Sequence, residues 1–153
     1  MLAEVLQKDA YRFYRTRLET LLGIPCSASD LEIHELIAHG FTPDTVMSLN
    51  NHYLPLSSEC DQIVSNKALK IRATQHQRLT VKESDRLFRL VHVTAMAGAI
   101  FGDSTKAVRW LSKPKKRFAG RKPYETLSTT PGIGQVERLL IGLTDPLPFL
   151  IVR

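Results

Sequence analysis

One short run of the sequence combines side chains that can bind DNA. A helix beginning after Ser65 would expose five polar or basic side chains: Ser65, Asn66, Lys67, Lys70 and Arg72. Asparagine can pair with adenine through two hydrogen bonds, lysine can contact guanine or phosphate, and a serine hydroxyl suits phosphate. The third helix of a helix-turn-helix module presents such side chains to the major groove, so the run predicts a recognition helix. The same composition also fits a small helical domain whose polar helix only faces water.

A second concentration of charge lies between residues 104 and 124, which carry eight Lys or Arg side chains and no Asp or Glu. The block also holds Trp110, the only tryptophan of the chain, and Phe118. Among so many cations, the two rings could anchor a protein interface, or the loop could bind phosphate. A single tryptophan beside a leucine also fits an anchor of the hydrophobic core. In a chain of net charge +6, the block indicates a surface for an anionic partner.

The sequence offers little for catalysis or for holding a metal or cofactor. The five histidines are dispersed, and His34 and His39 are five residues apart, which places them on different faces of a helix. Cys26 and Cys60 have no metal-ligand spacing, and no glycine-rich phosphate loop ends in Lys-Ser or Lys-Thr. We therefore expect a protein that is not an enzyme and uses no cofactor. The absence of a long apolar stretch and of a signal-peptide pattern predicts a cytoplasmic protein without a membrane span.

Helix signals account for most of the chain, whereas no run of residues alternates convincingly as a strand, so we expect an all-α fold. The strongest signal is the capping box formed by Thr80 and Glu83 in front of a long apolar helix. The expected helices span about 3–22, 30–39 (capped by Asp30), 43–52, 57–63, 66–73 (capped by Ser65), 81–101, 104–111 (capped by Asp103), 123–127 and 130–143 (capped by Thr129 or Thr130).

Two features bear on the DNA interpretation. The helix before the predicted recognition helix carries Glu59 and Asp61, which would repel DNA unless they turn away from it. The segment Thr130-Pro131-Gly132-Ile133-Gly134 is similar to the turn of a helix-hairpin-helix element, whose backbone N–H groups bind a phosphate. The helix expected before this turn is only one turn long, so we interpret the two glycines as part of a helix start.

An ordered series of residues in the second half of the chain carries a family resemblance. Its members are Ser84-Asp85-Arg86-Leu87-Phe88-Arg89, Ala97, Phe101-Gly102-Asp103, Lys106-Ala107, Trp110-Leu111, Pro114, Phe118, Gly120, Pro123, Leu127, Thr129, Gly132 and Val136-Glu137. Over residues 79–143, the series resembles the toxin-binding domain of the Xre/MbcA/ParS antitoxins, which are partners of RES-domain toxins. The upstream helices resemble the divergent Xre-type helix-turn-helix of these proteins. The resemblance predicts an N-terminal helical region over 1–78 and a small helical toxin-binding domain over 79–153.

The resemblance implies a type II antitoxin. Such a protein binds a RES-domain toxin, an enzyme that consumes NAD⁺, and blocks access to its active site. The resemblance also implies repression of its own operon through operator DNA, and a homodimer within a hetero-oligomeric complex with the toxin. The alternative is a stand-alone helix-turn-helix regulator without a toxin partner, in which residues 65–72 and 104–124 both follow DNA phosphates.

The chain departs from the family pattern at its C-terminus, where Pro146 occupies the usual place of a glycine and an apolar tail follows. An exposed run of apolar residues from Phe149 to Val152 would promote aggregation, so we expect a partner surface to cover it. A tail that folds back on its own core, or that is disordered, is the alternative. The predicted toxin-binding residues are Trp110, Lys113, Arg117, Phe118, Arg121, Phe149 and Leu150.

Overall fold

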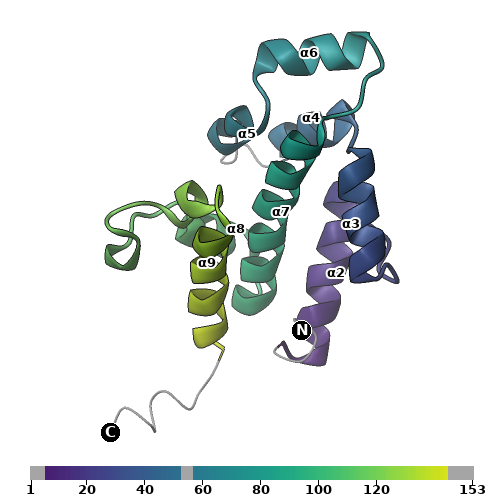
Figure 1. The fold of residues 1–153 in the computed structure, drawn as a ribbon. Coiled ribbons are helices and arrows are strands. Elements are labelled where there is room, and N and C mark those ends of the chain that lie inside the picture. The colour runs from purple at the N-terminus through teal and green to yellow at the C-terminus, as the bar shows by residue number, and fades with distance from the viewer. Residues whose placement is uncertain (1–5, 53–56, 145–153) are drawn as a thin grey trace, which may run out of the picture. The chain divides into compact units, whose positions relative to one another are not determined.

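The computed structural model describes residues 6–52 and 57–144, and all regular elements in these ranges are helices (Figure 1). The predicted all-α fold is therefore confirmed. The α-helices are α2 (Lys8–Leu22), α3 (Asp30–His39), α4 (Pro43–His52), α5 (Ser57–Ile63), α6 (Asn66–Thr74), α7 (Val81–Phe101), α8 (Ser104–Leu111) and α9 (Thr130–Gly142). Two 3-10 helices, η2 (Lys116–Phe118) and η3 (Pro123–Thr126), lie between α8 and α9. None of the described helices is long and apolar enough to cross a membrane.

Local capping residues set most helix starts where the sequence predicts them. The side chains of Ser65, Asp103 and Thr129 accept hydrogen bonds from the first turns of α6, α8 and α9. One expected cap is wrong by a residue: α3 is capped by Ser29 and not by Asp30. The Ser29 hydroxyl accepts from the Glu32 N–H, and the Glu32 carboxylate accepts from the Ser29 N–H, so this reciprocal pair makes Asp30 the first helical residue.

The helix α2, the first in the described part of the chain, begins later than predicted. It begins at Lys8, and residues 6 and 7 are not helical, whereas the sequence pattern predicts a helix from residue 3; residues 3–5 of that prediction lie outside the described residues. The Gln7 carbonyl accepts a hydrogen bond from the Tyr11 N–H at 2.9 Å. Its end at Leu22 agrees with the prediction. Gly23 then adopts a φ of +70°, a left-handed conformation that glycine reaches without steric cost and that ends the helix.

Backbone contacts divide the chain into two compact units, Thr16–His92 and Met1–Arg15 with Val93–Arg153. The chain passes from one unit to the other inside α2 and again inside α7. This grouping concerns packing, and the functional division into 1–78 and 79–153 stays a prediction.

Within the unit Thr16–His92, the start of α7 is held against the junction of α3 and α4. In the buried interior, the Phe41 N–H donates to the Ser84 hydroxyl at 3.0 Å. The Phe41 carbonyl accepts from the Leu79 N–H at 2.9 Å. Gly40, which ends α3 with a φ of +97°, lies so close to the Leu79 carbonyl that a Cβ would overlap it. The junction of α3 and α4 is thereby fixed against the residues that lead into α7.

The second unit packs the C-terminal half of α7 with α8, η3 and α9. Its core contains the fully buried residues Val93, Met96, Ala97, Ala107, Leu111, Val136 and Leu140. The hydroxyls of Thr94 and Tyr124 lie 2.8 Å apart inside this core and share a hydrogen bond. At the start of α9, the Gly132 backbone approaches the Thr126 carbonyl so closely that no side chain fits between them. These contacts fix α9 against η3.

Candidate functional site

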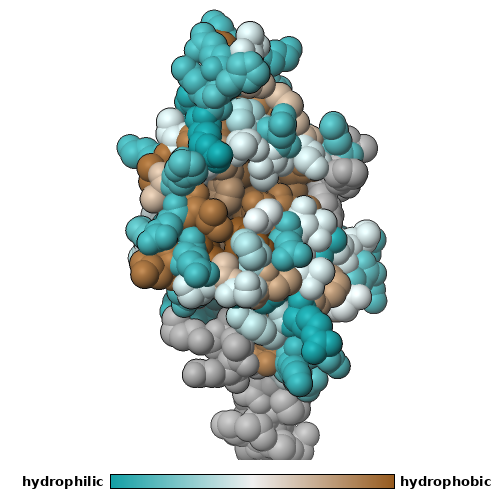
Figure 2. Space-filling view, turned by 90° about the vertical axis from the view of Figure 1, so that its right-hand side faces the viewer, coloured by the Kyte–Doolittle hydropathy of each residue, from teal (hydrophilic) through white to brown (hydrophobic). Residues whose placement is uncertain are grey.

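The helix α6 displays most of the side chains predicted to bind DNA. Asn66, Lys67 and Lys70 are exposed, whereas Leu69 is buried against the unit Thr16–His92. Figure 2 shows that the surface at the α6 end of this unit, at the top of the view, is mostly hydrophilic. The structure therefore brings three predicted residues together on one open face of one helix.

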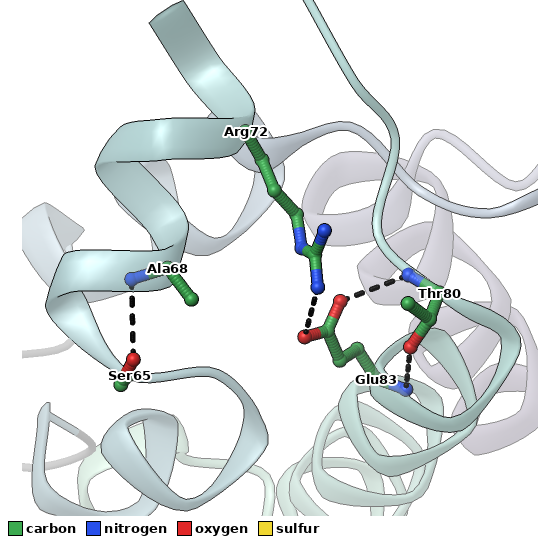
Figure 3. Close-up of polar contacts among 5 residues, drawn as sticks. All are labelled: Ser65, Ala68, Arg72, Thr80 and Glu83. Atoms are coloured by element: carbon green, nitrogen blue, oxygen red, sulfur yellow. Dashed lines mark hydrogen bonds and ion pairs between the residues drawn. The ribbon is translucent and has the colours of Figure 1, made fainter. Parts of the chain in front are cut away.

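Ser65 is exposed but has a structural task as well. Its hydroxyl oxygen accepts from the Ala68 N–H at 3.1 Å and so caps α6 (Figure 3). The hydroxyl hydrogen remains able to donate, and the free N–H groups of the first helical turn lie beside it. The predicted phosphate contact of Ser65 is thus compatible with its role as the cap.

Arg72 differs from the other predicted DNA-binding residues because its guanidinium faces a carboxylate of the same chain. The Arg72 Nη2 atom lies 2.9 Å from Oε2 of Glu83, in the first turn of α7 (Figure 3). The other oxygen of Glu83 accepts from the Thr80 N–H at 2.9 Å, while the Glu83 N–H donates to the Thr80 hydroxyl at 3.1 Å. The sequence identified this capping box but not the third partner that joins it.

The environment of Glu83 favours its charged form. Burial alone would raise the pKa of the carboxyl, but the hydrogen bonds from Arg72 and Thr80 outweigh burial and hold the pKa below its usual value. The side chains of Arg72 and Glu83 are only 23% and 13% exposed, so solvent screens this pair less than an ion pair on the open surface.

The helix α5 carries the acidic residues that could oppose DNA binding. Asp61 is exposed, and the half-buried Glu59 accepts from the Ser58 hydroxyl at 2.8 Å. Between them, Cys60 points into the core at 1% exposure. Burial, followed by the charges of Glu59 and Asp61, raises the pKa of the Cys60 thiol to about 12. This cysteine is therefore a core residue without nucleophilic character at neutral pH.

The basic segment after α8 forms a closed loop. The Lys115 N–H donates to the Arg121 carbonyl at 3.1 Å, and the Gly120 N–H donates to the Lys115 carbonyl at 3.0 Å. Phe118, at the centre of the loop, is only 7% exposed. In this structure its ring therefore anchors the loop in the core, while Lys113, Arg117 and Arg121 are exposed around it.

Trp110 lies at the base of this loop and is half-buried. Its ring tilts against that of Phe101 at a centroid distance of 6.0 Å. The Lys115 ammonium lies 4.3 Å from the Trp110 ring centroid, a cation–π contact. Burial, and then the neighbouring charge of Lys113, lowers the pKa of Lys115. Lys115 was not among the predicted site residues, because nothing in its local sequence indicates that it folds back over the tryptophan.

Two predicted toxin-binding residues, Phe149 and Leu150, lie outside the described part of the chain. Among the residues that the structure describes, no group of three or more His, Cys, Asp or Glu side chains could hold a metal ion. The candidate surfaces are therefore the polar face of α6 in one unit and the closed basic loop in the other.

Comparison with known proteins identifies the family. The family model of the antitoxin Xre/MbcA/ParS C-terminal toxin-binding domain matches residues 96–144. A protein named antitoxin Xre, from Pseudomonas putida, is 49% identical over 145 residues, which cover 95% of this chain and 91% of that protein. The chain belongs to the Xre antitoxin family. A second antitoxin Xre, from Yersinia enterocolitica, is 30% identical over 118 residues, or 75% of this chain and 79% of that protein.

As an Xre antitoxin, the protein serves in a toxin–antitoxin system and is not an enzyme. The matched domain begins within α7 and contains Trp110, the closed basic loop and α9. The predicted family is confirmed, although the resemblance began at residue 79 and the family model begins at residue 96. The residues Ser84 to Arg89, which contributed to the resemblance, thus lie before the matched domain.

Proposed function

We propose that this Xre antitoxin neutralises a RES-domain toxin, an enzyme that consumes NAD⁺, by covering its active site. The observation that carries the proposal is the toxin-binding domain matched over residues 96–144, with its basic loop built as a closed unit. A loop held by its own hydrogen bonds loses little conformational entropy when a partner binds it. The partner surface is expected to be acidic, because Lys113, Arg117 and Arg121 face outwards.

Co-expression with the protein encoded by the neighbouring reading frame tests this proposal. Arg117→Glu together with Arg121→Glu should weaken the complex at least tenfold, as measured by calorimetry, because like charges then face each other. Lys67→Glu with Lys70→Glu on α6 is the matched control and should leave toxin affinity unchanged. Equal affinity of the loop variant and the wild type would exclude the loop from the interface.

The tail is proposed to complete neutralisation. In this proposal Phe149 and Leu150 enter or cover the toxin's active-site pocket, which would account for an apolar terminus on an otherwise charged chain. Deleting residues 146–153 should then restore toxicity in co-expressing cells, even where the two proteins still co-purify. Full protection by the shortened chain would contradict this part of the proposal.

The second part of the proposal is repression of the antitoxin's own operon through α6. Asn66, Lys67 and Lys70 form an exposed polar face on a helix that follows two short helices, as in a helix-turn-helix module. A homodimer would present two such helices to half-sites about one helical turn apart, within a hetero-oligomeric complex with the toxin. Lys67→Ala should weaken binding to operator DNA and reduce the slope of log affinity against log salt by about one.

The stand-alone regulator remains the alternative to a toxin partner. Membership of an antitoxin family favours the antitoxin, and isolating the protein with the product of the neighbouring gene separates the two functions. A protein that binds its operator but captures no toxin from co-expressing cells would support the stand-alone regulator.

A further inference from the structure

The helix α6 has little apolar anchoring of its own. Leu69 is its one buried residue at 5% exposure, whereas Ile71 is 44% exposed. A hydrophobic contact has no preferred direction, so one leucine can hold a helix in place without fixing its rotation or tilt. If α6 enters a DNA groove, a directional contact besides the packing of Leu69 must determine its orientation.

The ion pair between Arg72 and Glu83 supplies a second and directional contact. Arg72 lies in the last turn of α6 and Glu83 in the first turn of α7, and the chain between them turns through His76, at a φ of +55°. The Glu83 carboxylate is already held by the hydrogen bond from the Thr80 N–H, while the Glu83 backbone N–H donates to the Thr80 hydroxyl (Figure 3). Because one partner is fixed in advance, the pair loses less side-chain entropy than an ion pair between two free side chains.

The guanidinium of Arg72 is directed into the unit. Its Nη2 atom donates to Glu83, and its Nε atom is buried without an acceptor among the described residues. By contrast, Lys67 and Lys70 on the same helix are exposed. A phosphate bound by Arg72 would have to compete with a carboxylate only 2.9 Å away.

Glu83 is tied to the rest of the unit Thr16–His92. The neighbouring Ser84 accepts from the buried Phe41 N–H at 3.0 Å, and the Arg78 side chain donates to the Gly40 carbonyl at 2.8 Å. The carboxylate that pairs with Arg72 therefore lies beside residues that are hydrogen-bonded to the junction of α3 and α4.

We propose that the ion pair between Arg72 and Glu83 is a clamp that sets the orientation of α6, so that Arg72 is a positioning residue for DNA binding and not a phosphate contact. The proposed clamp gives Arg72 a different role from the predicted DNA contact, and it rests on the proposed function of α6 in operator binding. It also adds Glu83, an acidic residue, to the groups on which DNA affinity depends.

Glu83→Gln tests the clamp because a positioning role for Glu83 and a mere negative charge near DNA predict opposite changes in DNA affinity. Glutamine keeps the capping box with Thr80, so α7 should still form. If Glu83 is only a negative charge near DNA, its removal should tighten binding. If it is a clamp, its removal should weaken binding by about fivefold, the effect of losing a partly exposed ion pair. The measurement uses the full chain and a labelled duplex from the DNA immediately upstream of its own gene, at graded salt.

Asp85→Asn is the matched control. Asp85 is also a carboxylate near the start of α7, but its ion pair, at 3.0 Å, is with Arg89 of the same helix and not with a residue of α6. The control should leave affinity unchanged or slightly higher. In addition, Arg72→Ala should leave the salt slope intact, unlike Lys67→Ala, and should cost nothing further in the Glu83→Gln background.

A readout without DNA separates failure of the clamp from failure of the proposed repression. Backbone amides of α6 should exchange hydrogen faster in Glu83→Gln than in the wild type or in Asp85→Asn. If the wild type binds no operator DNA, the repression proposal is wrong and hydrogen exchange alone decides whether the clamp exists. If the wild type binds and Glu83→Gln binds as tightly or more tightly, the positioning role of the pair is overturned.

Discussion

Replacing Gly132 by alanine should destabilise the protein, whereas the same change at Gly134 should not. Both glycines lie in the first half of α9, where alanine is intrinsically favoured over glycine by up to about 1 kcal/mol. At Gly132, however, an added Cβ would overlap the Thr126 carbonyl oxygen and lie 3.0 Å from the Thr129 hydroxyl. At Gly134 it would meet only the flexible end of Arg138, at 3.7 Å.

The size of the stability loss in Gly132→Ala follows from the backbone that an added Cβ would displace. The overlapping atom at Gly132 belongs to the backbone of η3, so relief requires η3 and α9 to separate, and overpacking of this kind costs about 1–3 kcal/mol or more. Displacement would also weaken the cap in which the Gly132 N–H donates to the Thr129 hydroxyl at 3.1 Å, worth about 1 kcal/mol. After subtracting the gain in helix propensity, we expect a net loss of about 2 kcal/mol. For a chain of this size, that loss lowers the thermal midpoint by about 4–8 °C.

Urea denaturation followed by circular dichroism measures both variants. Gly134→Ala should be as stable as the wild type or more stable by about 0.5–1 kcal/mol, since alanine lowers the entropy of the unfolded chain. Toxin binding by Gly134→Ala should be unchanged. If Gly132→Ala is as stable as the wild type, or if both variants lose the same stability, the close approach of α9 to η3 is not what requires glycine.

Three further experiments, two of them with substitutions, test the interior and the ion pair. Thr94→Val removes the buried hydrogen bond with Tyr124 and should lower the free energy of unfolding by about 1–2 kcal/mol in urea titrations; an unchanged value would contradict a stabilising role for this bond. A thiol reagent at pH 8 should modify only the exposed Cys26 in the folded protein, because burial raises the pKa of the Cys60 thiol to about 12. Cys60 should react only after denaturant unfolds the chain. Rapid reaction of both thiols in the folded protein would show that Cys60 is not a protected core residue. The pKa of Glu83 is lowered in the folded state, so its contribution to stability is present above about pH 4.5 and is lost as the pH falls through the folded pKa. The thermal midpoint of Glu83→Gln should therefore decline less steeply in acid than that of the wild type. Parallel curves for the two proteins would count against a stabilising role for the ion pair.

Helix existence and most helix starts could be predicted from the sequence because they depend on neighbours within four residues. Ser65, Asp103 and the pair Thr80 and Glu83 each satisfy backbone N–H groups of the turn that follows them. The error at Ser29 has the same local origin. Two adjacent residues can both cap a helix, and only the reciprocal bond with Glu32 selects one of them.

The internal arrangement of the basic loop could not be predicted in this way. Trp110 and Phe118 are both aromatic residues among cations, yet Phe118 is buried while Trp110 is half-buried under Lys115. Which ring turns inwards depends on the backbone bonds that close the loop between Lys115 and Arg121. The two bonds that close the loop join residues five and six positions apart without helical periodicity, so no pattern in the sequence marks them.

The role of a cation depends on its nearest acceptor, which charge counting does not reveal. Residues 64–92 carry seven basic and two acidic side chains, and this excess predicts a surface for an anionic partner. In the structure both acids, Glu83 and Asp85, hold arginines of the same block, Arg72 and Arg89. These arginines are indistinguishable by charge from the exposed Lys67, yet they are already engaged with carboxylates. The net charge of the block is unchanged by pairing. We nevertheless expect DNA phosphates to meet the exposed lysines of α6, because the Arg72 guanidinium already pairs with the Glu83 carboxylate.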